Sequence, residues 1–332
     1  MSHHVVRRPA YLATIADASQ TCLTWCSARK PRPVHPNNRR NQLHNSPIQS
    51  TFNATGARIA YFEWGERGAP AVLLIHATGF HARCWDQTVA SLPPDTHVIA
   101  VDLRGHGRSE KTGPIADWTV PAQDIKELVA HLKLHDAIGA GHSMGGHTLI
   151  QVAAAHPQAF KRLVLVDPVM MTPELYDSAN AAWPEETEHP VARRRNAWGS
   201  WQDMFEAFKD RNPYSLWRPQ VLEDYCRFGV VPKADGSGVE LACPPAIEAS
   251  IYKAAAGRNI YELAKQIECP VIVLRAHQRP PGQRDPRDFS GSPTWEGLAS
   301  AFRQGRDVYL PHLTHFIPMQ DPELVAKYIG ES

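Results

Sequence analysis

The chain has 332 residues, of which 43% are hydrophobic and 21% are charged, and its formal net charge is +1. This length and composition predict one large α/β domain with an insertion. The near-neutral charge argues against nucleic acid or an anionic membrane surface as a partner. The sequence contains no stretch of about 18 apolar residues, so it predicts no transmembrane helix.

Residues 1–50 differ in composition from the rest of the chain. Their basic residues stand against a single acid, Asp17, and His35-Pro36-Asn37-Asn38 signals coil. They contain no continuous apolar segment of a secretory signal. We therefore expect a disordered basic leader, or an upstream start codon, with an organelle transit peptide as the alternative. The six cysteines form no C-x-x-C pair, which predicts reduced thiols and a cytoplasmic location.

The folded part, residues 51–332, alternates apolar strand-like runs with helical spacing. A first, half-exposed strand is expected at 58–64, and a helix at 119–134 with Ile125, Leu128, Val129 and Leu132 on one face. Short continuous apolar runs predict buried parallel strands at 71–76, 97–102, 136–140, 162–167, 270–275 and 306–310. Asp321 before Pro322 is typical of the start of a final helix. This order predicts a doubly wound, mostly parallel α/β sheet.

The strand pattern stops between about 169 and 260. This segment is rich in tryptophan and has amphipathic pieces such as Trp201–Phe208. It predicts a helical insertion over the carboxyl ends of the strands, where open α/β sheets bind ligands; we call it the cap. The cap tryptophans are Trp183, Trp198, Trp201 and Trp217.

Gly141-His142-Ser143-Met144-Gly145 fits G-x-S-x-G between a predicted strand and a predicted helix. This is the context of a nucleophile elbow, a sharp turn that exposes the serine hydroxyl. Gly141 and Gly145 leave the space that side chains would occupy in so tight a turn. The dinucleotide-binding alternative fails because Met144 stands where a third glycine would be needed. Ser143 is therefore the predicted nucleophile.

A serine nucleophile needs a base, and the base needs a group that orients it. His315 follows the last predicted strand and precedes the last helix, so a loop at a strand end carries it toward Ser143. His312 is the local competitor. Trp85 is expected either to line the pocket or to pack in the core.

Over about residues 51–332 the chain resembles the α/β-hydrolase superfamily. The resemblance rests on four segments: Leu74–Phe80, Asp102–Ser109, the elbow, and Thr314–Pro318. It implies an oxyanion hole formed by the backbone N–H groups of Thr78 and Met144. Ala77 stands where the family usually has glycine. The Asp102–Ser109 segment is expected to be structural.

The acid of the triad has three candidates. The family most often places it after the strand at 270–275, where this chain has Asp285 and Asp288 only later in a long loop. Some branches place it at the end of the strand after the elbow helix, where Asp167 stands. We predict Asp167, with Asp288 and Asp285 as alternatives.

These residues predict a hydrolase without cofactor or metal that cleaves small, fairly apolar carboxylic esters through an acyl-enzyme. A carbon–carbon bond hydrolase of ring-cleavage products would use the same residues. A non-catalytic binding protein with the hydrolase fold is the alternative from another class. The sequence does not indicate the oligomeric state.

Overall fold

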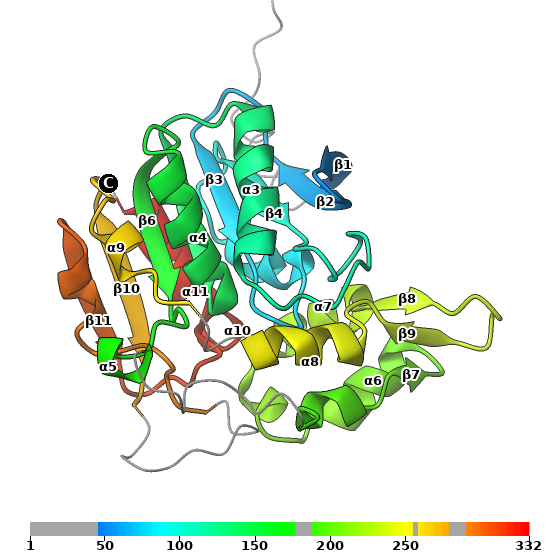
Figure 1. The fold of residues 1–332 in the computed structure, drawn as a ribbon. Coiled ribbons are helices and arrows are strands. Elements are labelled where there is room, and N and C mark those ends of the chain that lie inside the picture. The colour runs from blue at the N-terminus through cyan, green and yellow to red at the C-terminus, as the bar shows by residue number, and fades with distance from the viewer. Residues whose placement is uncertain (1–45, 177–186, 255–257, 279–289, 332) are drawn as a thin grey trace, which may run out of the picture. The chain divides into compact units, whose positions relative to one another are not determined.

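The computed structural model describes residues 46–176, 187–254, 258–278 and 290–331. Within these ranges, eight strands form one sheet in the order β1-β2-β4-β3-β5-β6-β10-β11 (Figure 1). The strands are β1 Ile48–Ala54, β2 Ala57–Trp64, β3 Ala71–Ile75, β4 His97–Val101, β5 Ala137–His142, β6 Phe160–Val166, β10 Val271–Ala276 and β11 Gly305–Leu310. From β4 to β11 all neighbours are parallel, whereas β1, β2 and β4 pair antiparallel. The predicted mostly parallel sheet is confirmed.

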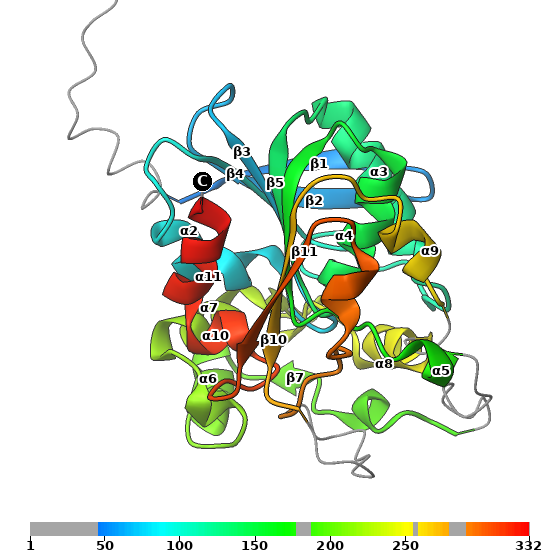
Figure 2. The same cartoon turned by 90° about the vertical axis from the view of Figure 1, so that its left-hand side faces the viewer.

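Helices cover both faces of this sheet. Figure 2 shows α2 and α11 on one side of the sheet and α3, α4 and α9 on the other. The helices outside the cap are η1 Ala82–Trp85, α2 Asp86–Ala90, α3 Thr119–Leu132, α4 Met144–Ala155, α9 Tyr261–Ala264, η4 Leu298–Ala301, α10 Ile317–Gln320 and α11 Pro322–Gly330. A hydrophobic core lies on each face of the sheet, and alternate residues of β3 point into one or the other. Leu73 and Ile75 pack in the core under α3 and α4. Val72 and Leu74 pack in the core under α2 and α11. The doubly wound arrangement is thus confirmed.

Local signals in the sequence explain where two of these helices form. In α3, Ile125, Leu128 and Val129 are buried on one face, as their spacing predicts. At the start of α11 the Asp321 side chain accepts a hydrogen bond from the Leu324 N–H at 3.0 Å, and Pro322 is the first helical residue. Trp85 is 1% exposed and packs in the core under α2 and α11, so it does not line a pocket.

The amino-terminal edge of the sheet corrects two expectations. Strand β1 begins at Ile48, so the expected boundary after residue 50 lies inside a strand. Its side chains are largely exposed, which is why no buried apolar run revealed it. Strand β2 was expected to be half exposed, yet it is almost wholly buried because its two faces pack into the two hydrophobic cores, with Tyr61 in one and Phe62 in the other. Residues 1–45 of the predicted leader lie outside the described residues.

The cap lies beyond the carboxyl ends of the strands (Figure 1). Its helices are α5 Pro173–Tyr176, η2 Pro190–Arg193, α6 Trp201–Phe208, η3 Tyr214–Leu216, α7 Pro219–Phe228 and α8 Pro245–Ala254. The expected helical cap is present, and it also contains a small antiparallel sheet of β7 Ala197–Trp198, β9 Val239–Leu241 and β8 Val230–Pro232. Strands of two or three residues are too short to show a period of two. Among the described residues, no helix has the length and apolar character needed to cross a membrane.

Candidate active site

Ser143 lies at a sharp turn between β5 and α4. Its backbone has φ +56° and ψ −119°, a positive-φ conformation that costs a non-glycine residue about 1–3 kcal/mol. The turn fits only because its neighbours lack side chains. A Cβ on Gly141 would collide with the carbonyl of Gly145, and a Cβ on Gly145 would collide with the carbonyl of Ile75. The strand, turn and helix expected for a nucleophile elbow are therefore present around Ser143.

His315 lies between Ser143 and Asp167. Its Nε2 is 3.0 Å from Ser143 Oγ, and its Nδ1 is 2.6 Å from Asp167 Oδ2. The carboxylate only accepts, so we assign the ring proton to Nδ1, which leaves Nε2 to accept from the serine hydroxyl. All three residues are buried, whereas the competitor His312 is exposed. The structure thus brings the three predicted residues into one hydrogen-bonded chain.

Asp167 stands directly after β6 and is held by several donors. Its Oδ1 accepts from the Ala276 N–H at 2.9 Å and from the Ser292 hydroxyl at 2.6 Å. Its Oδ2 is directed at His315. These bonds orient the two oxygens differently and compensate the burial of a carboxylate. The alternative acids Asp285 and Asp288 lie outside the described residues.

Thr78 and Met144 meet beside the nucleophile. The Thr78 hydroxyl donates to Met144 Sδ at 3.4 Å, and both residues are buried. Met144 is the first residue of α4, so its N–H has no partner within the helix. Among the described residues, neither of the two backbone N–H groups has a hydrogen-bond acceptor. Both donors are thus available to an oxyanion in front of Ser143.

Two buried histidines hold the loop that carries Thr78. His76 Nδ1 donates to the Ala77 carbonyl at 2.7 Å, and its Nε2 accepts from the Leu103 N–H at 3.0 Å. His106 Nε2 accepts from the Gly79 N–H at 3.0 Å, and its Nδ1 donates to the Arg104 carbonyl at 2.9 Å. Burial lowers the pKa of His76 well below its usual value and that of His106 to about 4, so both rings are neutral. These hydrogen bonds hold the loop that carries Thr78 in place, although Ala77 stands where the family usually has glycine.

His142, the residue before the nucleophile, is a contact that the sequence analysis missed. Its Nε2 donates to the backbone carbonyl of His315 at 2.8 Å. Burial, followed by the proximity of His315, lowers the pKa of His142 well below its usual value. The neutral ring therefore ties the loop of the predicted base to the strand that carries the predicted nucleophile. Its place inside G-x-S-x-G was the only signal in the sequence.

A pocket of about 630 Å³ opens above Ser143 and extends into the cap. Aromatic side chains form much of its wall, and neighbouring rings of Phe80, Trp217 and Phe316 have centroids within 5.2–6.2 Å of one another. Trp198 also lines the pocket, while Trp201 packs only at the edge of the cap core. Trp183 lies outside the described residues.

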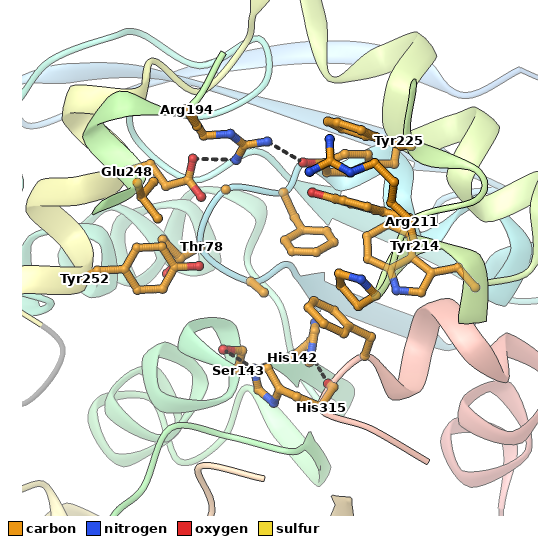
Figure 3. Close-up of a pocket in the computed structure, with 18 of the residues that line it drawn as sticks. Thr78, His142, Ser143, Arg194, Arg211, Tyr214, Tyr225, Glu248, Tyr252 and His315 are labelled. Carbon is orange, nitrogen blue, oxygen red and sulfur yellow. Dashed lines mark hydrogen bonds and ion pairs between the residues drawn. The ribbon is translucent and has the colours of Figure 1, made fainter. Parts of the chain in front are cut away.

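The pocket also has a charged end that the sequence analysis did not foresee. Figure 3 shows Arg194, Arg211, Tyr214 and Tyr225 on the side of the pocket opposite Ser143 and His315. Arg194 donates to Glu248 at 2.7 Å and to the Tyr225 hydroxyl at 3.1 Å. These residues come from separate cap elements, so no short sequence motif could have predicted that they lie together. Within the described ranges, no cluster of three or more His, Cys, Asp or Glu could hold a metal ion.

Comparisons with known proteins agree with this architecture. The model of a family described as the alpha/beta hydrolase family matches residues 72–328. The chain is 26% identical over 282 residues to the bifunctional esterase/perhydrolase DCH of Acinetobacter calcoaceticus, covering 82% of this chain and 94% of the relative. It is 34% identical over 149 residues to lipase LipV of Mycobacterium tuberculosis, covering 42% of this chain and 55% of the relative.

A solved structure shares the fold at low identity. The crystal structure of E-2-(acetamidomethylene)succinate hydrolase superposes with a TM-score of 0.67 at 21% identity, covering 85% of this chain and 97% of that one. The matched region spans about half of LipV, and 28% of an uncharacterised relative from Mycobacterium bovis.

Proposed function

The chain belongs to the alpha/beta hydrolase family, and we propose that it is a serine hydrolase that cleaves small, fairly apolar carboxylic esters through an acyl-enzyme intermediate. The observation that carries this proposal is the hydrogen-bonded chain from Ser143 through His315 to Asp167. Such a chain activates a hydroxyl that is unreactive at its ordinary pKa. No cofactor or metal is required for this chemistry.

In the first half-reaction, Ser143 Oγ attacks the ester carbonyl carbon while His315 Nε2 takes the hydroxyl proton. Asp167 holds Nδ1–H and stabilises the imidazolium that forms. The backbone N–H groups of Thr78 and Met144 donate hydrogen bonds to the former carbonyl oxygen and stabilise its negative charge. The tetrahedral intermediate collapses when the bond to the alcohol oxygen breaks, and His315 returns the proton to that oxygen.

In the second half-reaction, water replaces the alcohol. His315 Nε2 takes a proton from the water as its oxygen attacks the acyl carbon, and the same oxyanion donors serve the second intermediate. Collapse of that intermediate breaks the bond to Ser143 Oγ, which regains its proton from His315. The acid is released and the enzyme returns to its initial state.

Two further observations support an ester as the substrate. The aromatic wall next to Ser143 suits an apolar acyl or alcohol group. DCH is named an esterase/perhydrolase and LipV a lipase, which favours ester chemistry within the family. The cytoplasmic location stays a prediction from the cysteines, of which the four in the described residues are free thiols.

The test combines turnover with labelling. We expect the protein to hydrolyse para-nitrophenyl esters and to react stoichiometrically with a fluorophosphonate at Ser143. Ser143→Ala should abolish labelling and lower kcat by about a million-fold, as triad deletions do elsewhere, with an unchanged melting temperature. Substantial residual turnover in that variant would contradict the proposal.

The same experiment separates the alternatives. A non-catalytic binding protein with this fold would be labelled without turning over any ester. A carbon–carbon hydrolase would be labelled and would cleave vinylogous diketones faster than simple esters. An ester preference in a panel of both substrate types supports the proposed function.

A further inference from the structure

The charged end of the pocket holds more positive than negative charge. The charged residues among the described lining residues are Arg194, Arg195, Arg211 and Glu248. Glu248 is the single acid in this set, so an apolar substrate alone would leave cations facing it. Whether this excess is available to a ligand depends on what each arginine already contacts.

Arg194 is already compensated. Its guanidinium forms the ion pair with Glu248 at 2.7 Å, and the Glu248 side chain is only 5% exposed. Its other terminal nitrogen donates to the Tyr225 hydroxyl. Burial raises the pKa of Glu248, and the approach of Arg194 opposes that rise. The pair is therefore a structural part of the pocket wall.

Arg195 is also occupied. Its Nε donates to the Ala197 carbonyl at 2.9 Å, and its guanidinium lies 3.7 Å from the centre of the Trp198 ring. These contacts hold its head group against the cap rather than in the pocket. Arg195 thus lines the pocket with a side chain whose head group is already engaged.

Arg211 differs from both. It follows α6, and its guanidinium reaches toward the pocket beside Tyr214 (Figure 3). No carboxylate, carbonyl or ring among the described residues pairs with its side chain. Burial raises the pKa of the nearby Tyr214 and Tyr225, so their hydroxyls stay protonated. A cation flanked by neutral hydroxyls is suited to an anion that enters the pocket.

We propose that the substrate carries a carboxylate at the end away from its scissile bond, and that Arg211 binds this carboxylate while Ser143 attacks the ester. The proposal rests on the proposed ester hydrolysis and adds the substrate class. One unpaired guanidinium compensates one negative charge and presents two parallel N–H donors, which matches a carboxylate. The aromatic wall between the two ends then contacts the apolar middle of the substrate.

The kinetic test compares esters that differ only in the terminal charge. We expect mono-para-nitrophenyl adipate to be a better substrate than para-nitrophenyl hexanoate, which has the same acyl length. Arg211→Gln should lower kcat/KM for the adipyl ester by about 10- to 100-fold, mainly through KM, as expected for loss of a hydrogen-bonded charge. The same variant should change kcat/KM for the hexanoate by less than about threefold.

Two matched variants separate the role of the guanidinium from that of charge. Arg227→Gln removes one charge from the cap helix α7, outside the pocket lining, and should change kcat/KM for both substrates by less than about threefold. Arg211→Lys keeps the charge without the fork and should give an intermediate loss for the adipyl ester. A second pair, para-acetoxybenzoate and phenyl acetate, places the carboxylate on the alcohol side.

A binding measurement keeps the inference separate from the proposed activity. Titration calorimetry should detect adipate binding to Ser143→Ala, and the added Arg211→Gln change should weaken it about tenfold or more. Efficient turnover of neutral esters with no Arg211-dependent gain in either pair would overturn the inference and leave the esterase proposal standing. Arg211-dependent adipate binding without ester turnover would reject the esterase and keep the anion site. Absence of both adipate binding and carboxylate preference overturns the inference.

Discussion

Asp167 Oδ2 lies 2.6 Å from His315 Nδ1, although the two residues are 148 positions apart. Asp167 follows β6, and His315 lies in the loop between β11 and α10. The two meet because β6, β10 and β11 are consecutive parallel strands whose carboxyl ends share one edge. The backbone N–H of Ala276, at the end of β10, donates to the other oxygen of Asp167. The middle strand thus orients the carboxylate that contacts His315.

Asp167→Asn should lower kcat by about a thousand-fold or more. Asparagine keeps the shape of the side chain, but its amide can donate to Nδ1 and so impose the wrong His315 tautomer. Steady-state hydrolysis of a para-nitrophenyl ester measures the loss. Asp285→Asn and Asp288→Asn are the matched controls, and each should cost less than about tenfold. A crippling effect of Asp288→Asn with a mild Asp167→Asn would assign the acid to the long loop instead.

His142→Phe should lower kcat about three- to tenfold with little change in KM. The variant removes the neutral donor to the His315 carbonyl, a hydrogen bond of ordinary strength, while a ring still fills the site. Because burial keeps the pKa of His142 well below its usual value, the loss should be the same at pH 6 and pH 8. His142→Gln, which restores an N–H donor, should recover part of the rate. A loss that grows strongly toward acid pH would contradict a neutral His142.

The free energy of unfolding should fall as pH drops from about 6.5 to 5. Burial lowers the pKa of His81 to about 3 and those of His106 and His147 to about 4. Below about pH 6.5 the unfolded chain therefore binds protons that the folded chain does not, which favours unfolding. Each such histidine removes up to about 1.4 kcal/mol per pH unit in this window. Denaturant unfolding at several pH values measures the slope.

Buried acids with a raised pKa, such as Asp224, oppose this trend, and one variant isolates a single histidine. Burial raises the pKa of Asp224 to about 7, so the folded state binds its proton more readily and stability gains as pH falls below 7. That gain offsets about one histidine. The His147 ring contacts Gln151 and the Arg258 carbonyl rather than the Ser143 hydroxyl, although its backbone N–H donates to the Ser143 carbonyl. His147→Gln should flatten the slope by about one proton with little change in ester turnover. An unchanged slope would mean that His147 titrates normally in the folded protein.

Deletion of residues 1–45 should leave the melting temperature and ester turnover nearly unchanged, as the composition of this segment predicts. Deletion of residues 1–54 also removes β1 and exposes the edge of β2, so we expect lower stability and aggregation. Thermal unfolding and light scattering of the two truncations measure the difference. Equal melting temperatures for the two truncations would show that β1 contributes nothing to the sheet.

Much of the fold follows from local patterns in the sequence. Short apolar runs mark the buried parallel strands β3, β4, β5, β6 and β10, and the spacing of Ile125, Leu128 and Val129 marks α3, because burial on both faces or on one helical face leaves a local pattern. The edge strand β11 is found where a strand was expected at 306–310, but it is mostly exposed rather than buried. The glycines around Ser143 and the Asp321–Pro322 pair likewise act within a few residues. The exposed β1 and the very short cap strands leave no such trace.

Local patterns could not predict which distant residues contact one another in the folded chain. The sequence left Asp167, Asp285 and Asp288 in competition, since each follows a strand and spacing alone does not tell which carboxylate faces His315. The register of β6, β10 and β11 brings Asp167 to Nδ1. In the same way, Arg194 is paired and Arg211 is not because Glu248, far along the chain, folds back onto Arg194. Local periodicity determines the elements, whereas hydrogen bonds and charge pairs between distant residues depend on how those elements pack.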